Sequence, residues 1–88
     1  MPESSPSTVF EVRVELKPGI LDAEAENVKK TLSLLGITEL NSVGTARLYV
    51  LDFGGASPAR AEELARRAVD RLLANPVIHY VTITPRSR

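Results

Sequence analysis

The chain has 88 residues, 43% hydrophobic and 25% charged, and its eleven basic residues balance its eleven acidic ones. This predicts one small globular domain whose zero net charge gives no long-range attraction for nucleic acid or an anionic membrane. Because cysteine is absent, a disulfide framework, a thiolate metal site and a thiol nucleophile are excluded. No run approaches the ~18 apolar residues of a membrane-spanning helix, so we expect a cytoplasmic protein.

The first expected element is a strand from Thr8 to Lys17, where apolar and polar residues alternate. We expect a flexible tail over residues 1–7, one domain over 8–85 and a short tail over 86–88. The predicted inner face of this strand carries Phe10, Val12, Val14 and Leu16, and its outer face carries Val9, Glu11, Arg13, Glu15 and Lys17.

A turn and a helix are expected next. Pro18 and Gly19 form the turn, Asp22 can cap the helix, and Gly36 supplies a left-handed stop. Lys17 beside this turn could contact an anion, although a plain turn with a solvated lysine is favoured. The predicted apolar stripe of the helix is Ala25, Val28, Leu32 and Leu35.

Residues 38–53 allow two interpretations, because the segment is long for one strand and has a glycine near its middle. It could form a hairpin of two strands around residues 43–46, or one long bent strand. We favour two strands. Residues 48–53 are apolar on both faces, as expected for a central strand or one that meets a partner, and Gly54-Gly55 ends the segment.

The second helix is predicted to begin with Ser57 as its cap and Pro58 at its first position. Its opening turn would hold Glu62 and Glu63. Spacing of four residues predicts two outward ion pairs on its solvated face, namely Glu62 with Arg66 and Glu63 with Arg67.

The second helix must stop at Asn75-Pro76, because proline has no backbone N–H and disfavours helical geometry in the residue before it. We expect the last strand to begin at Val77 and run to Thr84, with alternating faces. The predicted junction between helix and strand is therefore very short.

The predicted order is strand, helix, strand, strand, helix, strand. With right-handed crossovers this gives a ferredoxin-like α+β sandwich, an antiparallel sheet with both helices on one face. The other face would carry Ile78, Tyr80 and part of residues 48–53. Such an apolar face predicts a homo-oligomer or another protein partner.

The sequence offers no constellation for catalysis by this chain. No glycine-rich phosphate cradle is present, and a serine triad would depend on His79 alone. We interpret His79 as an interface or sheet residue, and paired carboxylates such as Glu24 and Glu26 as favourable charges at a helix start. No catalytic and no metal-binding residue is predicted, so we expect a non-catalytic binding or assembly module.

Two segments resemble a known family: Lys17-Pro18-Gly19-Ile20-Leu21-Asp22 and Leu72-Leu73-Ala74-Asn75-Pro76-Val77-Ile78. They are similar to PurS, the small subunit of phosphoribosylformylglycinamidine (FGAM) synthase. The resemblance implies a role in de novo purine biosynthesis, where glutamine-derived ammonia and ATP convert formylglycinamide ribonucleotide to its amidine. It implies that PurL holds the nucleotide and substrate sites and PurQ the glutaminase cysteine. PurS would be a dimerising bridge between them and could help ammonia pass, with ATP and Mg used by the complex and no cofactor on this chain.

The chain departs from the family pattern at two places. The family commonly has Val-Arg-x-Gly-Lys before its third strand, where this chain has Val43-Gly44-Thr45-Ala46-Arg47. Arg47 is therefore a candidate partner contact. Acidic residues usually follow the Asn-Pro junction, where this chain has His79 and Tyr80, and Tyr80 is a second candidate contact.

An alternative from another class is an ACT-like regulatory domain, which shares the order of elements and binds an amino acid at a dimer interface beside its Pro-Gly turn. The Asn75-Pro76 junction, which an ACT-like domain does not require, distinguishes the two.

Overall fold

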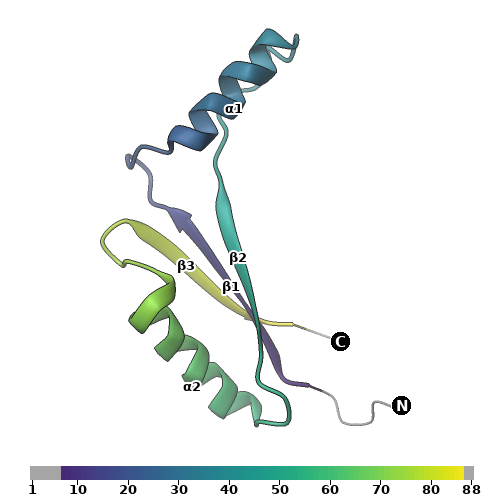
Figure 1. Ribbon diagram of the computed structural model, residues 1–88, viewed down its shortest axis with the longest axis vertical. Helices are drawn as coiled ribbons and strands as arrows, with labels where there is room; N and C mark the ends of the chain where they lie inside the picture. The colour runs from purple at the N-terminus through teal and green to yellow at the C-terminus, as the bar shows by residue number, and fades with distance from the viewer. Residues whose placement is uncertain (1–6, 87–88) are drawn as a thin grey trace.

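The structure is a computed structural model that describes residues 7–86. Most of the predicted N-terminal tail, residues 1–6, and positions 87–88 lie outside this range. The elements in chain order are strand β1 (Val9–Leu16), helix α1 (Ala23–Leu34), strand β2 (Ala46–Asp52), helix α2 (Pro58–Ala68), the π-helical turn η1 (Val69–Leu73) and strand β3 (His79–Pro85) (Figure 1).

The sheet has three antiparallel strands in the order β2-β1-β3, with β1 in the centre. The predicted alternation along β1 is confirmed from Phe10 to Val14, because Phe10, Val12 and Val14 are buried on one face while Arg13 is exposed on the other. Val9, predicted on the outer face, is also buried. Alternation also holds in β3 from His79 onward. The register places Tyr49 and Ile83 on either side of Val12, so these three residues share the inner face.

Helix α2 covers the inner face of the sheet and forms the core with it (Figure 1). Phe10 packs against Ala61 and Ala65, both fully buried. Alanine at these two positions lets the helix lie close to the sheet, where a longer side chain would separate the layers. Leu51, Phe53 and Ile83 surround this cluster.

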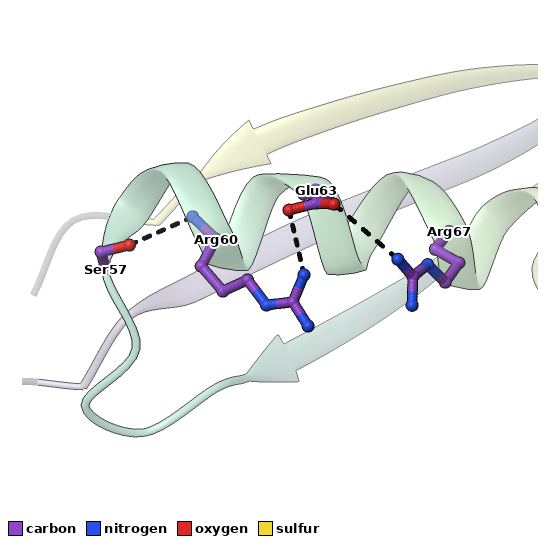
Figure 2. A network of polar contacts seen from close by, with 4 residues as sticks. All are labelled: Ser57, Arg60, Glu63 and Arg67. Atoms are coloured by element: carbon purple, nitrogen blue, oxygen red, sulfur yellow. Dashed lines mark hydrogen bonds and ion pairs between the residues drawn. The ribbon is translucent and has the colours of Figure 1, made fainter.

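The ends and the outer face of α2 follow the prediction closely. Ser57 caps the helix by accepting from the N–H of Arg60 at 3.2 Å, and Pro58 is the first helical residue. The predicted pairs of Glu62 with Arg66 and Glu63 with Arg67 form at 3.0 and 3.7 Å. Glu63 also binds Arg60 at 3.0 Å, so one carboxylate joins two guanidinium groups (Figure 2). The two glutamates lie beyond the first turn, contrary to our expectation.

Helix α1 does not cover the sheet, and the expectation that both helices share one sheet face is wrong. It projects beyond the end of the sheet, and among residues 7–86 no strand or other helix packs extensively against it (Figure 1). The ends of α1 are nevertheless as predicted, with Asp22 as its cap and Gly36 at a φ of +96° after its last turn. The N–H groups of Gly36 and Ile37 bind the carbonyls of Ser33 and Leu32, which closes the helix.

The preference for two strands within residues 38–53 is also wrong, since only Ala46–Asp52 forms a strand. Residues 35–45 form a return segment that leads from α1 back to the sheet. Its polar groups bind the α1 region in place of a sheet neighbour: Lys29 donates to the carbonyl of Asn41 at 2.8 Å, and Thr45 donates to Asp22. The fold is therefore a ferredoxin-like α+β arrangement with three strands in one chain.

The helical segment stops before Asn75-Pro76 as predicted, but the junction that follows it is longer than predicted. After η1 the side chain of Asn75 accepts from the N–H of Val77 at 2.9 Å, and the carbonyl of Asn75 accepts from Ile78 and His79. These bonds build a turn around Pro76. Strand β3 therefore begins at His79, two residues later than expected.

Candidate functional site

A cavity of about 520 Å³ lies on the inner face of the sheet, between the end of the helical segment α2–η1 and the first residues of α1. Sheet residues on one side face the start of α1 and the end of the return segment on the other. Its lining includes Val14, Leu16, Asp22, Glu24, Thr45, Arg47, Tyr49, Leu73 and His79. Arg47, predicted as a partner contact, thus lies beside a hollow with both charged and apolar walls.

Asp22 is the polar centre of this region. Its Oδ1 accepts from the N–H of Ala25 at 2.9 Å, and its Oδ2 accepts from the hydroxyl of Thr45 at 2.7 Å and from the N–H of Thr45 at 3.2 Å. The Thr45 hydroxyl, followed by the N–H of Ala25, lowers the pKa of this carboxyl below its ordinary value. The sequence predicted the cap but not the bond to Thr45, because no pattern links residues 23 positions apart.

A second cavity, of about 600 Å³, lies at the β3 edge of the sheet near the Asn-Pro junction. Lys17 and Tyr80, two further predicted contacts, both line it, together with Asp70, Pro76 and His79. Arg47 does not belong to this group. In the sheet register Arg47 lies opposite Val14 and Tyr80 lies opposite Glu15, so the two side chains belong to opposite sheet faces.

The turn beside Lys17 is already hydrogen-bonded within the chain. The N–H of Ile20 donates to the carbonyl of Lys17 at 3.1 Å, and Gly19 has a φ of +88°. A glycine with positive φ after a proline is typical of a type II turn. The N–H of Lys17 itself donates to Ile78 at 2.9 Å. Two N–H groups that an anion would need are therefore in use, which favours the plain turn.

His79 has a structural contact. Its Nδ1 accepts from the N–H of Asn75 at 2.9 Å, so the neutral ring carries its proton on Nε2. The imidazole thus helps to close the Asn-Pro turn. Among residues 7–86, no three His, Cys, Asp or Glu side chains cluster in a way that could hold a metal ion.

Large apolar side chains remain exposed on two surfaces. On the region around α1, Leu34 is 83% and Leu35 72% exposed. On the outer face of the sheet, Leu48, Val50 and Tyr80 are about half exposed, which is where the sequence predicted an apolar face. None of the helices formed by residues 7–86 has the length and apolar character needed to cross a bilayer.

The family model for PurS, described as phosphoribosylformylglycinamidine (FGAM) synthase, matches residues 9–87 of this chain. The chain belongs to the PurS family. Membership makes it a subunit of FGAM synthase, a ligase of purine biosynthesis, and does not favour the ACT-like alternative.

Individual PurS proteins match over nearly their full length. The PurS subunit of phosphoribosylformylglycinamidine synthase from Archaeoglobus fulgidus is 36% identical over 75 residues, which are 85% of this chain and 94% of that protein. The PurS structure from Methanocaldococcus jannaschii has a TM-score of 0.79 and 26% identity, covering 92% of this chain and 98% of that one.

A structure of PurLQS from Thermotoga maritima also contains a chain with this fold. The TM-score is 0.80 at 19% identity, covering 91% of this PurS-family chain and 98% of the other. The ferredoxin-like α+β class expected from the order of elements is thus confirmed by solved PurS structures.

Proposed function

We propose that this chain is the non-catalytic assembly subunit of FGAM synthase and that it bridges PurL and PurQ. The observation that carries the proposal is the exposure, among residues 7–86, of large apolar side chains in two places: around α1, which stands apart from the sheet, and on the outer face of the sheet. Exposed groups of large apolar side chains are typical of protein interfaces. A structure of PurLQS from Thermotoga maritima, whose composition includes a chain of this fold, supports the proposal.

We infer that a second copy of the chain covers part of this surface. Strand β2 has a neighbour only on the β1 side within residues 7–86, so its outer edge is available for pairing. The adjacent outer face carries Leu48 and Val50, both about half exposed. A small domain with one helix on its sheet gains stability when a second copy buries such residues.

The three predicted contact residues suit a bridge with two ends. Lys17 and Tyr80 line the cavity at the β3 edge, whereas Arg47 lines the cavity at the base of α1. We propose that these two regions meet different partners, because Arg47 and Tyr80 belong to opposite faces of the sheet. Arg47 would supply the charged contact on its side, and Tyr80 an aromatic contact with a polar tip, as is common at interfaces.

The chemistry of the complex then belongs to its other subunits. ATP and Mg would be used by PurL, and ammonia from glutamine would come from PurQ, with this chain helping its transfer by holding the two together. We propose that the chain works in the cytoplasm, where purine synthesis takes place, and that residues 8–85 form the functional domain.

Alanine variants of the contact residues test this proposal. Arg47→Ala and Tyr80→Ala should each weaken binding to immobilised PurL or PurQ of the same organism, with each variant affecting a different partner. Thr82→Ala is the control, because Thr82 is an exposed residue of the same strand as Tyr80. Loss of binding in Thr82→Ala, or unchanged binding in both contact variants, contradicts the assigned contacts.

A further inference from the structure

The direction in which α1 projects is not set by packing against the rest of the fold. Within residues 7–86 no strand or other helix packs extensively against α1, and Ala25 is its only buried residue. The chain enters this region through the turn at Gly19 and leaves it at Thr45. A helix that is connected to the rest of the fold by only two stretches of backbone can change its direction, unless a further interaction links these two stretches.

The carboxylate of Asp22 links these two stretches. One oxygen caps α1 through the N–H of Ala25 at 2.9 Å. The other accepts both the hydroxyl and the N–H of Thr45, at 2.7 and 3.2 Å, immediately before β2 begins at Ala46. A single side chain therefore ties the start of the helix to the start of the strand.

A second tie holds the parts beyond this point together. Lys29 of α1 donates to the carbonyl of Asn41 in the return segment at 2.8 Å. Helix and return segment therefore lie side by side (Figure 1) and can move as one body, which we call the arm, residues 23–44, with Asp22 and Thr45 at its two connections to the rest of the chain. Because the Lys29 bond lies within the arm, it cannot set the angle between the arm and the sheet.

We propose that Asp22 and Thr45 form a clasp that fixes the direction of the arm relative to the sheet, with Asp22 as a positioning residue. The clasp is a property of the single chain. Holding the arm in one direction before association would reduce the entropy lost on binding, and this consequence rests on the proposed function.

Distance measurement by pulsed electron paramagnetic resonance tests the clasp directly. The chain has no cysteine, so Ser33→Cys on α1 and Thr84→Cys on β3 allow selective spin labelling at two exposed positions. Labelled chain is diluted with excess unlabelled chain, so that only distances within one molecule are read. The parent should give one narrow distance distribution.

Three further variants separate the clasp from the stability of the helix. Asp22→Ser retains a capping residue but is too short to reach Thr45, and it should broaden and shift the distribution while leaving the helical circular dichroism unchanged. Thr45→Val, which replaces the hydroxyl with a methyl group and leaves the backbone N–H in place, should give a smaller change, and Thr45→Ser should restore the parent distribution. An unchanged narrow distribution in Asp22→Ser overturns the clasp, and so does the same broadening in Thr45→Ser as in Thr45→Val. Neither result bears on binding to PurL or PurQ, which is measured separately.

Discussion

At the scale of single residues, Asp22 shows how one carboxylate can accept hydrogen bonds both from the first turn of a helix and from the residue before a strand. Its capping role was predictable, because a short acidic side chain before a helix is a strong local signal. Its bond to Thr45 depends on where the return segment ends, which only the three-dimensional structure shows. For Asn75, too, one part of its role was predictable from the sequence and another part was not. The sequence predicts the helix stop, and the structure adds the turn in which His79 takes part.

The Asp22 carboxyl makes stability depend on pH in the acidic range. Its folded-state pKa is lowered by the Thr45 hydroxyl and the N–H of Ala25. It therefore contributes stability above its unfolded pKa of about 3.9, and this contribution is lost as pH falls through the folded value. Thermal unfolding of the parent should show a steeper loss of Tm below about pH 4 than Asp22→Ser.

The comparison with Asp22→Ser isolates this carboxyl from its surroundings. Glu15, Glu24, Arg47 and His79 line the same cavity and are present in both proteins. Parallel curves of Tm against pH for parent and variant would show that the Thr45 bond does not stabilise the folded chain.

Asn75→Ala should weaken the junction between η1 and β3. The variant removes the side-chain acceptor of the Val77 N–H, and a net hydrogen bond of this kind is worth about 1 kcal/mol. Urea unfolding should show that loss in the free energy of unfolding. Val77→Ala serves as the control because Val77 is highly exposed and should change the free energy by less than about 0.5 kcal/mol. Equal effects of the two variants contradict the turn described here.

At the scale of elements, local signals predicted both helices, their caps and the first and last strands in the sequence, whereas the placement of α1 was not predictable. Its stripe of Ala25, Val28, Leu32 and Leu35 is the pattern of a helix that covers a sheet. This apolar stripe indicates only that the helix needs a surface to pack against, and it does not indicate whether that surface belongs to the same chain. The strand expected within residues 38–45 does not form for a related reason, since strand pairing depends on neighbours that are distant in the sequence.

Leu35→Glu should weaken self-association without unfolding α1. Leu35 is 72% exposed at the end of the helix, so the single chain loses little packing, whereas a second copy would meet a charge on its apolar surface. Ser33→Glu is the control, because it places the same negative charge near the same helix end and has a similar unfavourable interaction with the helix macrodipole. Light scattering should show a lower molar mass for Leu35→Glu alone. Equal masses for both variants would mean that the second copy does not cover this end of α1.

At the scale of the whole molecule, the proposed function depends on surfaces and not on a catalytic group. The residues predicted as contacts are divided between two cavities, with Lys17 and Tyr80 in one and Arg47 in the other. The sequence predicted these residues as contacts but could not assign them to two separate cavities, because that assignment depends on strand register and on which sheet face each side chain occupies. The chain thus combines one small core under α2 with an arm and a sheet face on which large apolar side chains are exposed.

The most direct test is size-exclusion chromatography with light scattering of this chain mixed with PurL and PurQ of its own organism, in the presence of glutamine and Mg-ADP. We expect all three proteins to elute together, and we expect PurL and PurQ to separate when this chain is omitted. Joint elution of PurL and PurQ without this chain, or elution of this chain by itself from the full mixture, would contradict its role as the assembly subunit.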